Sequence, residues 1–388
     1  FKQKTAYEIM PSLVGSEMCI RDSYILAGYL KPNPRSNEAA VKYFLLGAFS
    51  LGILLYGMSL LYGLTGSTNL HVIATALEGG GEHSQLLQLA LILVTAGIGF
   101  KIAAVPFHMW APDVYEGAPT PITAFLSVGS KAAAFAMLLR IFVEGLPSVA
   151  MYWQQLFEIL AIVTMVVGNI AAITQNNIKR MLAYSSVGQI GYIILGAALI
   201  NETAMMGSLI HIFNHAIMKG TLFLVAGTVV YNTGIEDIDG LKGLGKKMPY
   251  SMAAFTIASL SMIGVPLTVG FVSKWYIAVG AINASRWYFV PVILLGSILT
   301  AIYFWRIIEN IYFKKSDSEI QHLEKSAPPH QQSKNQTMQF ETRTRYDAPI
   351  GMLVPTLLLA GLCIIFGIAA FVPVSLADMA ASMLFGKI

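Results

Sequence analysis

The stretch AMMGSLIHIFNHAIMKGTLFLVAGTVVY (204–231) is typical of a membrane-spanning helix, because it carries only one lysine and two histidines among 28 mostly apolar residues. A helix of about 20 apolar residues is enough to cross the hydrocarbon core of a bilayer. Seven more stretches of spanning length are found at 39–63, 85–109, 120–146, 149–173, 178–200, 287–313 and 350–372. The sequence therefore predicts an all-α, polytopic membrane protein.

The composition supports this fold class. Of the 388 residues, 55% are hydrophobic and only 12% are charged, and the mean hydropathy is +0.63. A soluble domain carries about 25% charged residues. The two cysteines, Cys19 and Cys363, lie too far apart in sequence to suggest a metal site or a disulfide framework. These features exclude a cytosolic enzyme, a secreted disulfide scaffold and a nucleic-acid binder.

The first residues differ from the rest of the chain. Ser12–Ser23 (SLVGSEMCIRDS) resembles the translation of a sequencing adapter, and it lacks the basic and apolar regions of a signal peptide. We therefore expect residues 1–23 to be a non-native segment. We also expect the natural protein to have further helices before Tyr24.

The stretch 249–282 could form either two short helices or one interrupted span, because Gly264-Val265-Pro266 breaks it. As one span it places thirteen Lys and Arg residues in loops on one side of the membrane and two on the other. As two spans it divides them eight to seven. Basic loops collect on the cytoplasmic side, so we predict one interrupted span. Residues 24–313 then form the membrane domain, 314–347 a polar flexible loop, and 348–388 a last transmembrane helix and tail.

Four lysines lie deep within apolar stretches: Lys101, Lys131, Lys219 and Lys274. A lysine at the centre of a membrane helix costs about 2.5–3.5 kcal/mol, so such residues usually have a function. His211, His215 and Lys219 recur every four residues and therefore share one helix face. A desolvated lysine can exchange protons near neutral pH, and the ordinary pKa of histidine already lies close to neutral pH. We predict a proton relay through these six side chains.

The histidines and their surroundings allow two other interpretations. The HxxxH spacing could hold zinc, but the glutamate of zinc proteases is missing and no third ligand is evident, so we expect no metal. His108 and Trp110 are expected to belong to an interfacial belt. Buried lysines need counter-charges, yet acidic residues within the spans are few. We therefore expect a carboxylate from preceding helices or from a neighbouring subunit.

Several long segments resemble the antiporter-like subunits of respiratory complex I, specifically the subunit N family. They are SNEAAVKYFLLGAFSLGILLYGMSLLYGLTGSTNL (36–70), FKIAAVPFHMWAPDVYEGAPTPITAFLSVGSKAAAFAMLLRIF (100–142) and NNIKRMLAYSSVGQIGYIILG (176–196). HIFNHAIMKGTLFLVAGTVVY (211–231) and KKMPYSMAAFTIASLSMIGVPLTVGFVSKWY (246–276) are more similar to the D-type subunits of Mrp cation/proton antiporters. The resemblance covers residues 24–388 except the loop 314–347.

This resemblance implies a fragment of a fourteen-helix fold with two inverted five-helix repeats, interrupted helices and a hydrated axis of charged residues. By position, Lys101 matches the central channel lysine of the family and Lys131 its connecting lysine. Lys274 matches the lysine of the second broken helix, and His211, His215 and Lys219 match the histidine-bearing helix. The family's essential glutamate lies about seven residues before the tyrosine matching Tyr24. Glu17 occupies that place, but its neighbours are not those of the family.

The resemblance also implies a function, which is proton translocation as a subunit of NADH-quinone oxidoreductase (complex I) with no cofactor or redox site of its own. Its partners would be other membrane subunits, the lipid bilayer and protons or Na⁺, with no nucleic acid. It would lie in the inner membrane of a bacterium or archaeon, with the basic loops on the cytoplasmic side. The alternatives are an Mrp-type Na⁺/H⁺ antiporter subunit, a membrane scaffold subunit without its own channel, and a chimera of two genes joined around 185–210.

Overall fold

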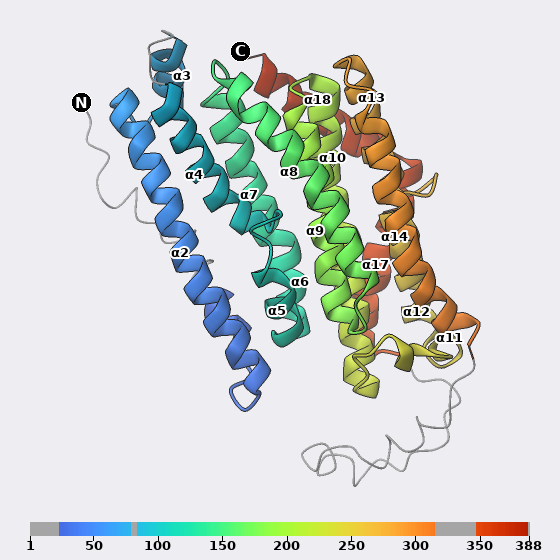
Figure 1. Cartoon of the computed structure of the whole chain (residues 1–388). Helices are drawn as coiled ribbons and strands as arrows, with labels where there is room; N and C mark the ends of the chain where they lie inside the picture. Colours follow the sequence, from blue (N-terminus) through green and yellow to red (C-terminus); the bar gives the residue numbers. More distant parts are fainter. Residues whose placement is uncertain (1–22, 79–83, 315–346, 387–388) are drawn as a thin grey trace.

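The computed structural model describes residues 23–78, 84–314 and 347–386, and nearly all of them are helical (Figure 1). The predictions for residues 1–22 and for the loop 315–346 lie outside the described residues. Eight helices are long and apolar enough to cross a membrane, so the prediction of an all-α polytopic membrane fold is confirmed. The helices and their bounds are α2 (Pro34–Thr65), α3 (Leu70–Glu78), α4 (Ser84–Ile102), α5 (Trp110–Gly117), α6 (Thr120–Phe125), α7 (Lys131–Leu139), α8 (Ala150–Ile173), α9 (Ile178–Ala198), α10 (Glu202–Thr233), α11 (Leu244–Lys247), α12 (Pro249–Ile263), α13 (Val269–Asn283), α14 (Phe289–Tyr312), α17 (Ile350–Ile368) and α18 (Phe371–Phe385).

The bounds of the long helices follow from local sequence. α10 begins after Asn201, whose side chain accepts a hydrogen bond from the backbone N–H of Ala204. It ends at Gly234, whose φ of 69° lies in the left-handed region that glycine adopts without strain. α2 likewise begins after Asn33 with a proline in its first turn, and it ends at Gly66 with φ 68°.

The stretch 249–282 is one interrupted span, as predicted. α12 ends at Gly264, which has φ 91°, and α13 begins at Val269. The two helices lie toward opposite ends of the bundle while α14 runs past both (Figure 1). The basic segments around Arg35, Lys179 and α11 consequently gather at one end of the bundle, the lower end in Figure 1.

The resemblance implies more than one interrupted helix, but the position of the second interruption was not predicted. The stretch 85–109 was expected to be continuous, but α4 ends at Ile102, Ala103 has φ 60°, and helical structure resumes only at Trp110. Pro106 lies within the break, and a proline cannot donate the backbone hydrogen bond that a helix needs. The Trp110 indole N–H donates instead to the carbonyl of Phe100, at 2.7 Å.

The prediction that Trp110 and His108 belong to an interfacial belt is wrong. Trp110 is only 2% exposed and stacks on the Tyr43 ring, with centroids 4.7 Å apart. His108 is also buried, with 7% exposure. Both side chains are buried because the break turns the chain back into the protein, where the indole N–H donates a second hydrogen bond to the Phe100 carbonyl, which also accepts from the backbone N–H of Ala103.

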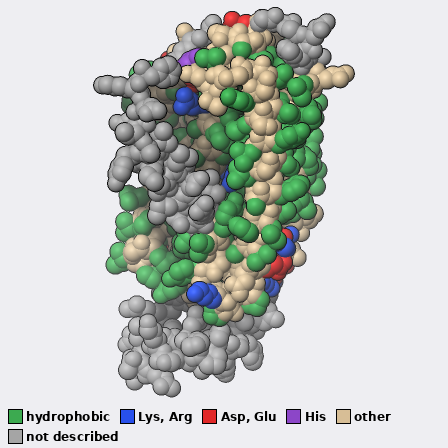
Figure 2. Space-filling view, turned by 90° about the vertical axis from the view of Figure 1, so that its left-hand side faces the viewer, with side chains coloured by type: hydrophobic (Ala, Val, Ile, Leu, Met, Phe, Trp, Pro, Cys, Tyr) green, Lys and Arg blue, Asp and Glu red, His purple; other side chains and the backbone are tan. Residues whose placement is uncertain are grey.

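α9 is the central helix and is buried along nearly its whole length against α8 and α10. At the crossing of α8 and α9, a Cβ on Gly168 would lie 2.5 Å from the backbone nitrogen of Gly188, so both positions need glycine. The outer helices α2 and α17 expose many apolar side chains. Figure 2 shows such side chains over much of the face that carries α2. An apolar exterior around a polar-lined centre is what a bilayer requires.

Candidate functional site

The structure brings five of the six predicted relay residues into one buried cluster. His211, His215 and Lys219 share one face of α10, as their spacing predicts, and they are 0%, 3% and 0% exposed. His215 interacts electrostatically with Lys219 and His211 on its own helix and with Lys131 on α7. His211 in turn interacts with Lys274 on α13. The cluster therefore crosses from α7 through α10 to α13, and it is called the relay cluster below.

Lys274 belongs to α13, and its side chain extends to the break where α12 ends. Its ammonium donates hydrogen bonds to the carbonyls of Met262 (2.9 Å) and Ile263 (3.0 Å) and to Ser297 Oγ (3.0 Å). The last carbonyls of a helix have no intrahelical partner and carry partial negative charge. The interrupted span therefore supplies backbone acceptors for this lysine. The ring of Tyr192 lies 4.7 Å from the ammonium.

Lys219 is held by α9. Its ammonium donates to the carbonyl of Leu182 (3.0 Å) and to Ser185 Oγ (2.8 Å). Ser185 also accepts a hydrogen bond from Tyr303 of α14, at 2.9 Å. The sequence interpretation missed Ser185 and Tyr303. A signal was present on α9, because Ser185, Gln189 and Tyr192 repeat at the spacing of one helix face.

Lys131 and the histidines leave polar atoms unpaired among the described residues. Lys131 Nζ has no hydrogen-bond partner and lies 5.5 Å from the Tyr115 ring centre. His211 Nδ1 is 2.8 Å from Ser273 Oγ, while Nε2 of both His211 and His215 is unpaired. Gln189 has both amide atoms unpaired at 0% exposure. Buried polar groups are rarely left unsatisfied and are commonly bound by ordered water, so this arrangement calls for water between the basic groups.

Lys101 lies apart from the relay cluster. It is in the last turn of α4, directly before the first break, and its ammonium is 5.8 Å from the Tyr24 ring centre. The centre of the Tyr24 ring lies 4.6 Å from that of the Tyr43 ring, and the Tyr43 hydroxyl lies near Ser130, which precedes Lys131. Aromatic side chains thus separate Lys101 from the rest of the predicted relay.

Carboxylates are not found beside these lysines in the described parts of the chain. Glu158 pairs with Arg286 and Glu144 with Arg140, and neither reaches Lys101, Lys131, Lys219 or Lys274 within 4 Å. The origin of a counter-charge stays a prediction. Within the same residues, no three His, Cys, Asp or Glu side chains come together as metal ligands, so the histidine pair has no third donor.

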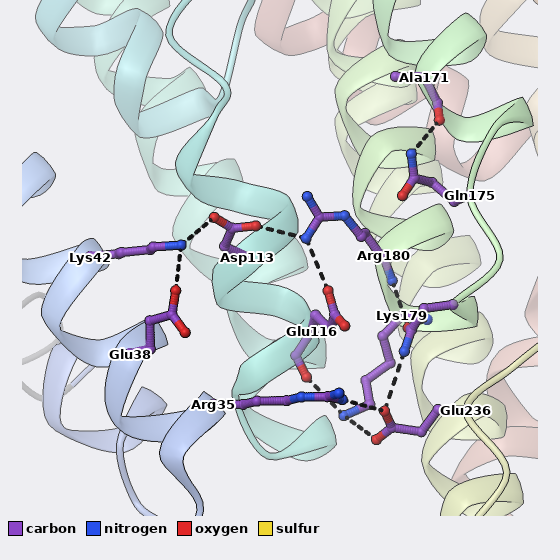
Figure 3. Close-up of polar contacts among 11 residues, drawn as sticks. Arg35, Glu38, Lys42, Asp113, Glu116, Ala171, Gln175, Lys179, Arg180 and Glu236 are labelled. Carbon is purple, nitrogen blue, oxygen red and sulfur yellow. Dashed lines mark hydrogen bonds and ion pairs between the residues drawn. The ribbon is translucent and has the colours of Figure 1, made fainter.

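A second polar site lies at the end of the bundle where the basic segments gather (Figure 3). Its ion pairs alternate in sign, and its members are Arg35, Glu38, Lys42, Asp113, Glu116, Lys179, Arg180 and Glu236. Arg180 pairs with both Asp113 (2.7 Å) and Glu116 (3.0 Å), and Lys42 pairs with Asp113 at 2.9 Å. Several of these side chains line a cavity of about 160 Å³. The site links α5, which follows the first break, to α2 and α9.

The pKa of Asp113 depends on two opposing effects, which are burial and hydrogen bonds from basic side chains. Partial burial raises the pKa of its carboxyl, but hydrogen bonds from Lys42 and Arg180 outweigh that effect. The pKa of Asp113 therefore lies below its ordinary value, and the carboxylate is charged at neutral pH.

Sequence comparisons find related membrane proteins. The family model described as "NADH:quinone oxidoreductase/Mrp antiporter, TM" matches residues 6–300. NADH-quinone oxidoreductase subunit N of Trichlorobacter lovleyi is 42% identical over 326 residues, which are 83% of this chain and 67% of that protein. The subunit N of Rhodospirillum rubrum is 38% identical over 320 residues, covering 82% of this chain and 66% of that protein. The chain thus spans about two thirds of the length of these relatives.

Solved structures share the fold. A chain of respiratory complex I from Thermus thermophilus aligns with a TM-score of 0.71 at 29% identity, over 94% of this chain and 74% of that one. A chain of an Mrp complex from Dietzia aligns with a TM-score of 0.79 at 24% identity, over 91% and 69%. At that identity the second likeness shows the fold alone. Since the family model covers most of the chain and the sequence relatives are near 40% identical, the chain belongs to the NADH:quinone oxidoreductase/Mrp antiporter transmembrane family.

Proposed function

We propose that the chain translocates protons as an antiporter-like subunit of an NADH-quinone oxidoreductase, using Lys101 and the relay cluster. Electron transfer elsewhere in the complex would drive it, so the chain needs no redox cofactor of its own. The other membrane subunits of that complex would be its partners. The membrane would be the inner membrane of a bacterium, with the basic end of the bundle on the cytoplasmic side.

The observation that carries this proposal is the relay cluster. Lys131, Lys219 and Lys274 come from the three helices α7, α10 and α13, and the two histidines of α10 interact with all three lysines. Each lysine would hold a proton and release it through water to the next basic group, because an amine and an imidazole can both donate and accept protons.

The choice of partner complex rests on sequence. The curated relatives near 40% identity are named as subunits N of NADH-quinone oxidoreductases. The Mrp likeness of the C-terminal half is weaker support for an Mrp-type Na⁺/H⁺ antiporter, which is therefore the second candidate. Pumping that requires Na⁺ and survives without NADH oxidation would favour it.

The test is alanine substitution of Lys101 and of Lys219 in the full-length subunit within its membrane complex. Both variants should abolish NADH-driven acidification of inverted membrane vesicles while the subunit is still retained in the purified complex. Lys31→Ala is the matched control, because Lys31 is an exposed lysine at the end of the bundle. Unchanged pumping in both variants would overturn the relay and favour a membrane scaffold subunit.

A further inference from the structure

A hydrogen-bonded branch leaves the relay cluster at Lys219 and runs through three other helices. Lys219 Nζ donates to Ser185 Oγ (2.8 Å), and the Tyr303 hydroxyl lies 2.9 Å from the same oxygen. Tyr303 also reaches Asn169 Oδ1, at 3.3 Å. Thr300 Oγ1 lies 3.1 Å from that same Asn169 oxygen. All five residues are at most 2% exposed.

The Tyr303 hydroxyl has more acceptors within reach than it can donate to at one time. Tyr303 has one hydroxyl hydrogen and two acceptors within reach, which are Ser185 Oγ and Asn169 Oδ1. Asn169 Oδ1 keeps Thr300 as a possible donor when Tyr303 turns away. The Tyr303 hydroxyl can therefore change its acceptor without leaving a buried group unpaired.

The protonation state of Lys219 decides which arrangement is favoured. As an ammonium, Lys219 only donates, so Ser185 accepts from it and its own hydrogen is free to go to the Tyr303 oxygen. Tyr303 then donates to Asn169. As a neutral amine, Lys219 offers a lone pair to Ser185, and Tyr303 donates to Ser185 instead. Loss or gain of one proton on Lys219 can thus reverse the hydrogen bond between Ser185 and Tyr303.

We propose that Ser185 and Tyr303 form a hydrogen-bond switch that accommodates Lys219 in both its charged and its neutral form, with Tyr303 as a positioning residue for the proton relay. This inference rests on the proposed function. It explains how a fully buried lysine with no carboxylate within 4 Å among the described residues can be used for transfer. A fixed set of acceptors would stabilise one protonation state and trap the proton.

The titratable groups around Lys219 include no carboxylate among the described residues. Lys131, on α7, acts on it electrostatically, and His215 lies one turn away on α10. Lys274 of α13 faces His211, two turns away. All of these groups are basic. Only α9 and α14 present hydroxyl groups to the Lys219 branch among the described residues, through Ser185 and Tyr303.

The experiment is Tyr303→Phe in the full-length subunit within its membrane complex. Phenylalanine keeps the ring but removes the Tyr303 oxygen, the acceptor for the Ser185 hydrogen in the switch when Lys219 is charged, so the charged form becomes less favourable. The alkaline limb of the pH profile of proton pumping should move by about one unit to lower pH, which is a tenfold change in the protonation ratio. The maximal pumping rate should stay within about twofold, and the complex should assemble.

Ser185→Ala is the second variant, and it should shift the profile in the same direction because a charged donor loses one acceptor. The double variant should shift it no further than the larger single shift, since both changes break the same switch. Tyr288→Phe is the control, because Tyr288 is half exposed at the other end of α14.

The outcomes separate the switch from the proposed function. If Lys219→Ala abolishes pumping while Tyr303→Phe and Ser185→Ala keep the wild-type pH profile, the switch is overturned and the relay stands. If the two single shifts add in the double variant, Ser185 and Tyr303 act independently and the switch is again overturned. Pumping that survives in Lys219→Ala overturns the proposed function and the switch with it.

Discussion

Replacing Gly168 by alanine should separate the two central helices of the bundle. A Cβ at this position would lie 2.5 Å from the backbone nitrogen of Gly188 and 2.9 Å from its Cα. An ordinary contact begins at 3.4 Å, so α8 and α9 would have to part by up to about 0.9 Å. The obstacle is backbone rather than a flexible side chain, so no rotamer change can relieve it. Such overpacking costs about 1–3 kcal/mol.

Gly52→Ala on α2 provides the matched control, because nothing lies within 4 Å of a Cβ built there. Alanine forms helix better than glycine by about 1 kcal/mol, and both variants gain that term. The difference between them is therefore the overpacking cost alone. At roughly 2 °C per kcal/mol, Gly168→Ala should melt about 2–6 °C below Gly52→Ala when the purified complex is heated. Equal melting temperatures would show that α8 and α9 do not approach each other this closely.

Two further predictions concern the first break and the ion-pair site. Trp110→Phe removes one of two hydrogen bonds to the Phe100 carbonyl, which keeps the backbone N–H of Ala103 as a donor, so it should destabilise the complex by about 0.5–1.5 kcal/mol in the same thermal assay. Trp305→Phe at an exposed position should have little effect. The pKa of Asp113 is lower in the folded protein than in the unfolded chain, so its stabilisation is present above about pH 4 and is lost as the pH falls through the folded value. Asp113→Asn should therefore flatten the acid side of the plot of melting temperature against pH, and an unchanged slope would contradict the ion-pair geometry.

The helices could be predicted because each depends on a sum over many residues, whereas the side of the membrane on which the basic loops lie stays a prediction. A span of about twenty apolar residues is visible in sequence whatever it packs against. The break at Gly264-Val265-Pro266 was visible as well, since glycine and proline stand together in the middle of an apolar stretch. The break at 103–109 was missed because Pro106 is its only strong signal, and apolar residues continue on both sides. What closes it is a tertiary contact of Trp110, which a pattern of single residues does not reveal.

The basic members of the site could be predicted for a related reason, because a lysine in an apolar stretch is conspicuous. The hydrogen-bond partners of these basic residues could not be predicted. Serine, tyrosine and asparagine are unremarkable in membrane helices, and Tyr303 lies 118 residues along the chain from Ser185. The backbone acceptors of Lys274 are equally invisible in sequence, because they arise only when α12 ends beside α13.

The contacts of the three clustered lysines also bear on how protons could pass between them under the proposed function. Two unit charges 4 Å apart repel by about 4 kcal/mol at an effective dielectric constant of 20, and by half that at 8 Å. Without a carboxylate beside it, the relay cluster can therefore hold few positive charges at once. Lys274 has three oxygen acceptors and Lys219 has two, whereas Lys131 Nζ has none among the described residues. A proton that moves from Lys131 toward Lys219 or, through the histidines, toward Lys274 therefore gains oxygen acceptors supplied by the protein. A carboxylate brought close to Lys131 by another subunit would reverse that preference, so a charge outside this chain could control when the proton moves.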